Sequence, residues 1–289
     1  MKKKLGNILL VLILVVGAAI MLYPTFSDYW NSFHQSRAIA GYSDAVANLN
    51  AEEYERIWQE AVTYNQNMSH RSGLTLLSNP EMEEYERQLN VGGNGVMGYI
   101  EIPKINVSLP VYHGTSEAVL QVAAGHIESS SLPVGGASTH CIISGHRGLP
   151  SAKLFTDLDQ MSEGDIFQLK ILNETLTYEV DQIRIVLPSE LGELSIVQDQ
   201  DYCTLVTCTP YGINTHRLLI RGKRIANPQA AAHVTADAVQ IDPVLVAPAA
   251  AAPMLLALTV WLIVNPGAKK KKKKGKKSKK PDHNDENPT

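Results

Sequence analysis

The chain has 289 residues, of which 44% are hydrophobic and 19% are charged, and it contains three cysteines. This composition excludes wholesale disorder, a collagen-like chain and a small domain held together by many disulfides. The formal net charge of −3 hides a strong segregation. Lys2–Lys4 carry a charge of +3, the tail from residue 269 carries ten lysines against three acids, and residues 5–268 carry 13 basic against 26 acidic side chains.

The first element is an uncharged apolar run of 19 residues from Leu5 to Tyr23. At a rise of about 1.5 Å per residue it spans roughly 28 Å, close to the hydrocarbon thickness of a bilayer. A cleaved signal peptide is the alternative, because three lysines precede the run. The residues that follow, Tyr23 to Phe26, offer no cleavage site of small residues. The sequence therefore predicts a retained transmembrane helix over 5–23 after a cytoplasmic basic end, 1–4.

Residues 24–93 are predicted to be largely helical. Apolar side chains recur every three to four positions over 25–68, and Asn50-Ala51-Glu52-Glu53 resembles a capping box that begins a second helix. Residues 69–94 are less regular, with several glycines and the pair Asn79-Pro80.

From residue 94 the hydrophobic pattern changes to short β-branched segments separated by Gly, Pro, Asn and Asp. Seven or eight short strands between 94 and 227 favour an all-β barrel or sandwich. The predicted strands are Val96–Ile102, Ile105–Val111, Thr139–Ser144, Ile166–Ile171, Thr175–Val186, Tyr202–Thr207 and His216–Arg221. An Ala-rich stretch, 228–243, is predicted to be a tether.

A second uncharged run of 21 residues covers 244–264 and is followed by the polylysine tail 265–289. An Ala/Pro-rich linker ending in a buried helix would explain 247–253, but not an apolar segment joined to polylysine. The lysines fit a membrane surface better than nucleic acid, which is not expected as a partner. Because basic residues lie outside both apolar runs, both termini are predicted to be cytoplasmic and the middle of the chain extracellular.

Three side chains near predicted strand ends could form a reactive site. Cys208 ends one β-branched run, His146 follows another at Ser144-Gly145, and Arg217 begins a third. Neighbouring cations raise the thiolate fraction of a cysteine, and an imidazolium can protonate a leaving amine. An arginine can stabilise an oxyanion without losing its charge. We expect the three groups to meet at one rim of a barrel.

The segments around these residues resemble the sortases. Thr204–Arg217 is similar to the sortase active-site signature and Ser144–Pro150 to the sortase histidine motif. The second apolar run and the helical N-terminal region resemble the pilus-assembling class C sortases of Gram-positive bacteria. This resemblance implies an eight-stranded sortase β-barrel, flanked here by two transmembrane helices, with no cofactor.

The resemblance also implies roles and a reaction. Cys208 would be the nucleophile, His146 the general acid and base, and Arg217 the ligand of substrate and oxyanion. The cysteine would cleave an LPXTG-like sorting signal between Thr and Gly, form a thioester, and transfer it to a lysine of a pilin subunit. The alternatives are anchoring of proteins to cell-wall peptide and, from another class, a surface protein that is itself a sortase substrate. The second lacks an LPXTG-like signal before the span at 244. A papain-like protease would need its cysteine on a helix.

Class C sortases carry an N-terminal lid with an Asp-Pro-aromatic motif, and this chain departs from it. The candidate is Asn79-Pro80 with Met82, which lacks the acid and the adjacent ring. We expect a lid segment near 74–86 that is latched more weakly, because Asn79 cannot form an ion pair with Arg217.

Other polar residues have simpler interpretations. His216 is predicted to point away from Arg217, His126 and His140 to be surface or satisfied core histidines, and Arg147 to be solvated or structural. The spacing of His and Cys predicts no metal site.

Cys141 and Cys203 each lie five residues before a predicted catalytic residue. Parallel neighbouring strands would place both thiols at the same level and on the same face. They are expected to be two buried reduced cysteines, with a disulfide as the sharper alternative.

Overall fold

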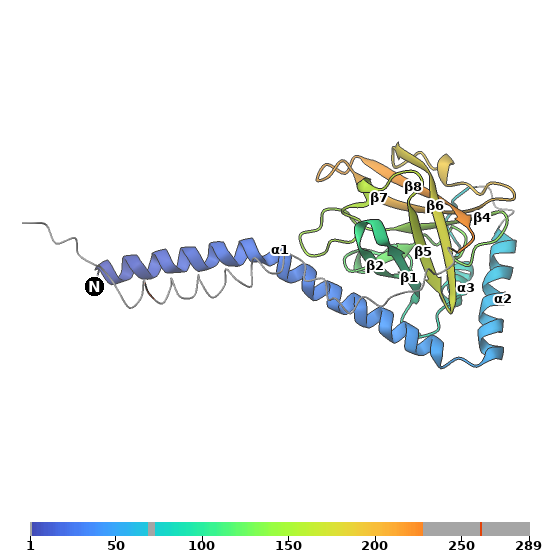
Figure 1. The fold of residues 1–289 in the computed structure, drawn as a ribbon, viewed down its shortest axis with the longest axis horizontal. Helices are drawn as coiled ribbons and strands as arrows, with labels where there is room; N and C mark the ends of the chain where they lie inside the picture. The colour runs from blue at the N-terminus through green and yellow to red at the C-terminus, as the bar shows by residue number, and fades with distance from the viewer. Residues whose placement is uncertain (1, 69–72, 228–260, 262–289) are drawn as a thin grey trace, which may run out of the picture. The chain divides into compact units, whose positions relative to one another are not determined.

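The computed structural model describes residues 2–68, 73–227 and residue 261. Of these, residues 20–68 and 73–227 belong to one compact unit. Its centre is a closed β-barrel whose strands are ordered β1-β2-β3-β4-β7-β8-β6-β5 (Figure 1). The strands are β1 Val96–Ile102, β2 Val107–His113, β3 Ala124–His126, β4 Thr139–Ser144, β5 Ile166–Ile171, β6 Glu174–Val186, β7 Asp201–Thr209 and β8 His216–Ile225. The predicted eight-stranded barrel is thus confirmed.

Two pairs of neighbouring strands in the barrel are parallel, β2 with β3 and β4 with β7, and the other pairs are antiparallel. The β4–β7 pair matters most for the predicted site, because both strands end at the same edge of the sheet. β8 runs antiparallel to β7, so it begins at that edge. The last residues of β4 and β7 and the first residues of β8 therefore come together.

The strand predictions hold best where β-branched residues are dense, as in β1, β4 and β5, whose bounds match. The predicted strand 105–111 starts too early, because Pro103–Ile105 form the 3-10 helix η1 and Asn106 adopts a left-handed conformation with φ of 51°. The strand β3 was missed. Its three residues, Ala-Gly-His, carry no alternating pattern, and tertiary pairing with β2 and β4 makes them a strand.

The helices are α1 Lys2–Ala47, α2 Ala51–Met68, α3 Asn79–Arg87 and α4 Glu117–Leu120, with short 3-10 helices η1, η2 Leu158–Gln160 and η3 Gly192–Leu194. The predicted capping box is confirmed: the Glu53 amide donates to the Asn50 side chain at 2.8 Å, and the Asn50 amide donates to the Glu53 carboxylate at 3.1 Å. The prediction of irregular structure was wrong for α3, since Ser78 and Glu81 form a capping box and Pro80 occupies the first turn.

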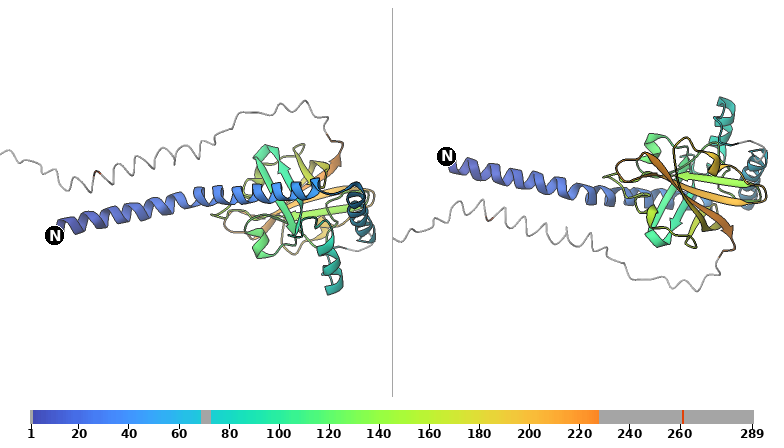
Figure 2. Two further views of the ribbon diagram at one scale, coloured as in Figure 1. Left: turned by 90° about the horizontal axis from the view of Figure 1, so that it is seen from below. Right: turned by 90° about the horizontal axis from the view of Figure 1, so that it is seen from above.

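The helical region is bound to the barrel by buried polar side chains. The Tyr42 hydroxyl on α1 donates to the carbonyl of Met97 at 2.9 Å and accepts from the amide of Leu172 at 2.7 Å. The Asn65 side chain on α2 forms two hydrogen bonds with the backbone of Leu132, at 2.7 and 3.0 Å. Figure 2 shows α2 and α3 on the same side of the barrel. The hydrogen bonds of Tyr42 and Asn65 fix the positions of α1 and α2 relative to the sheet.

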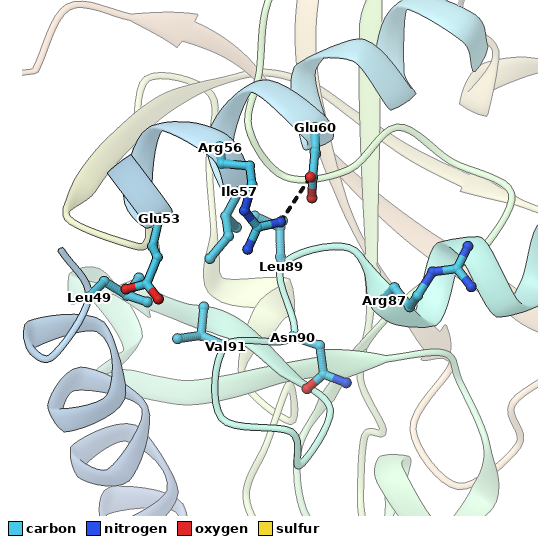
Figure 3. A pocket seen from close by; sticks show the side chains of 9 residues that line it. All are labelled: Leu49, Glu53, Arg56, Ile57, Glu60, Arg87, Leu89, Asn90 and Val91. Carbon is cyan, nitrogen blue, oxygen red and sulfur yellow. Dashed lines mark hydrogen bonds and ion pairs between the residues drawn. The ribbon is translucent and has the colours of Figure 1, made fainter. Parts of the chain in front are cut away.

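Between α2 and the segment after α3 lies a pocket of about 240 Å³ (Figure 3). An ion pair between Arg56 and Glu60 at 2.9 Å lies at its wall. Neither Cys208, His146 nor Arg217 lines it. The pocket lies within the helical region, because all its lining residues fall between 49 and 91, and it is separate from the predicted site.

Among the described residues, Ile8–Ala47 is the one helix long and apolar enough to cross a membrane, judged by length and composition. It contains most of the predicted span 5–23. The second predicted span, 244–264, lies outside the described residues except for Trp261, as do the tether 228–243 and the tail 265–289. These predictions, and the two-span topology that depends on them, remain predictions.

Candidate active site

The position of Cys208 follows from alternation along β7. Cys203 and Leu205 belong to the main core inside the barrel, whereas Val206 belongs to a separate apolar cluster. This outer cluster consists of Ile142, Leu194, Val206 and Leu219. Because successive side chains of a strand point to opposite faces, Cys208 shares the outer face with Val206. Its side chain is half-buried, so the thiol is partly open to solvent.

Arg217 is the register partner of Cys208 on the antiparallel strand β8. It lies two residues before Leu219 of the outer cluster and so faces the same side. Directly opposed residues of antiparallel strands have Cβ atoms about 5 Å apart. Among the described residues the guanidinium donates to the carbonyls of Asn214 at 3.2 Å and His216 at 3.1 Å. These bonds turn the guanidinium toward the carbonyls of its own loop.

His146 reaches the same face from β4. The parallel register pairs Ser144 with Val206, and the next residue, Gly145, donates to the Val206 carbonyl at 3.0 Å. The Thr207 hydroxyl donates to the Gly145 carbonyl at 2.8 Å. The chain thus follows β7 for one further residue, and His146 comes level with the end of β7. By alternation it lies on the outer face with Ile142 of the outer cluster.

The three predicted residues therefore lie on the outer face of β4, β7 and β8, where these strands meet at one edge. This edge is the rim of the barrel, where the three groups were expected to meet. The interior at this level is filled by core residues such as Leu205 and Leu218, so the three candidate residues lie on the outer side of the rim. An extended peptide can approach such a surface without entering the barrel.

Glu117 is a neighbour of His146 that the sequence did not reveal. Its carboxylate on α4 lies 3.7 Å from His146 Nε2, although the side chain is exposed. The two residues are 29 positions apart, and no local pattern relates them. At this distance the carboxylate can orient the imidazole.

Arg147 is structural rather than solvated. Its side chain is only 9% exposed, its guanidinium forms an ion pair with Asp159, and it donates to the Thr209 hydroxyl at 3.5 Å. It also lies over the Tyr211 ring, 5.8 Å from the centroid. Arg147 thus ties the loop after His146 to the residues that follow Cys208.

Two glycines of the histidine motif are required by close approach. A Cβ on Gly145 would lie 2.6 Å from the Phe155 ring, and one on Gly148 would lie 2.9 Å from Tyr211. Gly148 also has a φ of 76°, which side chains rarely adopt. These residues let the loop after β4 pack closely against its neighbours.

In the described structure the predicted lid residues Asn79, Pro80 and Met82 have surroundings other than the Cys208 thiol. Asn79 and Pro80 are exposed at the start of α3, and Met82 packs against the main core. In the same helix the buried Tyr85 hydroxyl bonds His126 Nδ1 at 2.9 Å. The part of the predicted lid segment that touches the outer face is Leu74, which packs against the outer cluster.

Two of the remaining histidines, His126 and His140, behave as predicted. His126 is buried with Nε2 2.8 Å from the Ser131 carbonyl, in addition to its bond with Tyr85. His140 is buried between the Ser195 carbonyl at 2.9 Å and the Thr204 hydroxyl at 2.7 Å. Burial lowers the pKa of His140 below its usual value. Both are satisfied core histidines. His216 bonds the neighbouring Thr215 at 2.9 Å.

Cys141 and Cys203 are register partners on the parallel strands β4 and β7, so the prediction that they share one level and one face is confirmed. Both are buried and carry free thiols, which agrees with two reduced cysteines rather than a disulfide. Burial raises the pKa of Cys203 well above its usual value.

Comparison with known proteins identifies the family of the chain. A model of the sortase domain matches residues 100–225, from within β1 to the end of β8. The crystal structure of sortase C1 from Streptococcus agalactiae is 54% identical, with a TM-score of 0.65, and the match covers 66% of this chain and all of that one. The chain belongs to the sortase family. Sortases are cysteine transpeptidases, and this one resembles class C.

Further relatives agree with this assignment. The structure of Streptococcus pneumoniae sortase C is 44% identical, with a TM-score of 0.60, over 66% of this chain and 97% of that one. Sortase D of Bacillus subtilis is 30% identical over 131 residues, 44% of this chain. This alignment spans 63% of the Bacillus subtilis protein. The similarity therefore extends beyond the barrel in the class C structures and is more limited in sortase D.

Proposed function

We propose that this sortase is a membrane-anchored transpeptidase that joins pilin subunits. It would cleave an LPXTG-like sorting signal between Thr and Gly and transfer the new carboxyl end to a lysine of the next subunit. The observation that carries the proposal is the register of β4, β7 and β8, which supports Cys208, His146 and Arg217 as one site. The similar sortase C of Streptococcus pneumoniae has pilin substrates, which favours pilins as substrates here.

In the first half of the reaction, Cys208 Sγ attacks the carbonyl carbon of the substrate Thr as a thiolate. A C–S bond forms, and the carbonyl oxygen becomes an oxyanion beside the Arg217 guanidinium, which stabilises it. The C–N bond to Gly then breaks, and His146 gives its proton to the leaving amine. The products are a thioester on Cys208 and a peptide with a free amino end.

In the second half, the ε-amine of a pilin lysine attacks the thioester carbonyl. His146, now neutral, takes a proton from the amine, and the C–S bond breaks to release the Cys208 thiolate. The new C–N bond is an isopeptide bond, and the enzyme returns to its starting state. Arg217 stabilises the oxyanion in both halves of the reaction, because its guanidinium stays protonated and positively charged near neutral pH.

The proposed arrangement in the cell places the catalytic domain outside the membrane. A helix over 5–23 and a second span over 244–264 would hold it at both ends, with both termini in the cytoplasm. The outer segments would comprise a helical and lid region, 24–93, and the barrel, 94–227. The proposed pilin substrates are secreted proteins, so a catalytic barrel outside the membrane would be able to meet them.

The test uses the full-length enzyme in lipid vesicles with a pilin that carries an LPXTG-like signal. Wild type should produce ladders of covalent oligomers, and Cys208→Ala should produce none. A thioester intermediate on Cys208, detected by mass spectrometry, supports the proposed chemistry. Transfer to a cell-wall peptide amine in preference to the pilin lysine would favour the alternative function, the anchoring of surface proteins to the cell wall. No thioester and no product would refute both functions.

A further inference from the structure

The part of α1 that belongs to the barrel unit has a face that is tied to the barrel. The Asp28 carboxylate accepts from the amide of Lys153 at 2.7 Å. The Asn31 amide donates to the carbonyl of Ser151 and the Gln35 amide to the carbonyl of Val122, both at 2.7 Å. Spacings of three and four residues place these three side chains on one side of the helix. Two of them hold the loop that follows His146.

The opposite face carries four exposed aromatic rings. Phe26, Tyr29, Trp30 and Phe33 are 67%, 56%, 56% and 51% exposed. At about 100° per residue, the centre of this group lies roughly 180° around the helix from the side chains that contact the barrel. Among the described residues, these rings pack mainly on one another and on their own helix, as Phe26 and Trp30 do with centroids 6.5 Å apart. We call Phe26, Tyr29, Trp30 and Phe33 the aromatic face.

The chemistry of the aromatic face matches the boundary between lipid and water. Trp and Tyr combine an apolar ring with a polar group and are enriched at headgroup level. The face begins three residues after the apolar run that ends at Tyr23, so lipid is the nearest apolar partner. One turn beyond Phe33, the Arg37 guanidinium lies 5.8 Å from that ring, where it can meet lipid phosphate.

The acidic residues support the same partner. Between residues 24 and 43 the chain has one acid, Asp28, and its carboxylate is turned toward the barrel. The aromatic face is therefore apolar with a cation at its end and has no carboxylate that an anionic surface would repel. A protein partner would not require this separation of charge.

We infer that the aromatic face lies in the headgroup layer of the membrane and holds the barrel with its His146 loop close to the bilayer. From Tyr23 to Phe33 the helix axis rises about 15 Å, whereas the headgroup layer is about 6 Å thick on each side. An upright helix would lift Phe33 out of the lipid. The helix must therefore incline with the aromatic face toward the membrane. Pro24 lies within α1 where such a bend is needed, because proline removes a helical hydrogen bond.

This arrangement rests on the proposed anchoring by residues 5–23 and goes beyond the proposed reaction. Asp28 and Asn31 bind the backbone of Lys153 and Ser151, seven and five residues after His146. The same helical segment would then contact lipid on one side and the His146 loop on the other. The catalytic face would be held at a fixed height above the membrane.

The test measures the depth of Trp30 in vesicles of phosphatidylcholine and phosphatidylglycerol. The full-length enzyme carries three tryptophans, so Trp58→Phe with Trp261→Phe leaves Trp30 as the only reporter. We expect lipids brominated near the headgroup to remove most of its emission, and iodide in the water to remove little. The matched control keeps Trp58, which packs against the barrel core from α2, and should be insensitive to brominated lipid.

Two outcomes would overturn the inference. Quenching of Trp30 by iodide but not by brominated lipid would place the aromatic face in water. Protection from both quenchers would mean that protein covers it, either a second copy of the chain or the run 244–264. The readout does not depend on catalysis. An enzyme with lipid-quenched Trp30 that forms no pilin oligomers would refute the proposed function alone, and an active enzyme with water-exposed Trp30 would refute the inference alone.

Discussion

Replacing Leu74 by alanine should make Cys208 more accessible. Leu74 is the contact between the predicted lid segment and the outer cluster, where Val206 lies two residues before Cys208 and Leu219 two residues after Arg217. Two residues along a strand correspond to about 7 Å, so a segment held at Leu74 lies close to the thiol. If this contact holds the lid down, weakening it should raise the fraction of molecules in which Cys208 is open to a reagent.

The size of the effect follows from burial. Burying a leucine side chain fully contributes about 1.5–3 kcal/mol, and Leu74 is only half-buried. The truncation should therefore cost the closed state about 1 kcal/mol, which corresponds to about a fivefold increase in the open fraction. When opening and closing are fast relative to the chemical step, the alkylation rate of Cys208 rises by the same factor.

The assay is the rate at which a maleimide labels Cys208, followed by mass spectrometry to confirm the site. Leu76→Ala is a matched control, because Leu76 lies two residues away in the same segment and is 101% exposed. It should label at the wild-type rate. Equal rates for wild type and both variants would refute the reasoning, and so would equal acceleration in both variants, since that would reflect the flexibility of the segment rather than the Leu74 contact.

Three further predictions concern the site and the core. Arg217→Lys should lower kcat by about 10²–10³, because a compact ammonium cannot reproduce the contacts of a guanidinium with the oxyanion. As a control, Cys208 should be alkylated at the wild-type rate, which would show that the thiol is intact. An unchanged kcat would exclude the proposed role of Arg217. In the native enzyme only Cys208 should react with Ellman's reagent, because Cys141 and Cys203 are buried. All three thiols should react in urea. Fast reaction of more than one thiol in the native enzyme would contradict the burial of Cys141 and Cys203. Burial lowers the pKa of His140. Below about pH 6.5 the unfolded chain therefore binds a proton on this histidine that the native state does not bind, and the free energy of unfolding falls as the pH drops. The urea midpoint should therefore fall less between pH 7.5 and 5.5 in His140→Gln than in wild type, and an equal fall would assign the acid sensitivity to other groups.

Several elements were predictable because the determining interactions are local. The capping box at Asn50 joins residues three apart, and the β-branched runs of β1, β4 and β5 mark their own bounds. The helix α3 escaped prediction although Ser78 and Glu81 form the same kind of cap, because the glycines and the Asn-Pro pair suggested irregular structure. Strand β3 had no local signal, since its pairing partners lie elsewhere in the chain.

The candidate site likewise combines residues that the sequence indicated with residues that only the folded structure revealed. Cys208, His146 and Arg217 could be proposed from the sequence because each belongs to a motif of adjacent residues. Glu117 and Leu74 were not assigned their places, because their contacts with His146 and with the outer cluster exist only after the chain has folded. Distances between such residues depend on sheet closure and loop packing, which no spacing in the sequence records.

The segregated charge, the apolar run that ends at Tyr23, the barrel class and the three candidate site residues could be read from the sequence itself, because short-range patterns of charge, hydropathy and β-branching and short motifs indicate them. The tertiary structure alone decided that the candidate residues lie on the outside of the sheet, that Cys141 and Cys203 are in register, and that the aromatic face is turned away from the barrel. The physical reason is that a side chain's surroundings depend on which strands pair and in which register. Those pairings are long-range and are settled by the packing of the whole core.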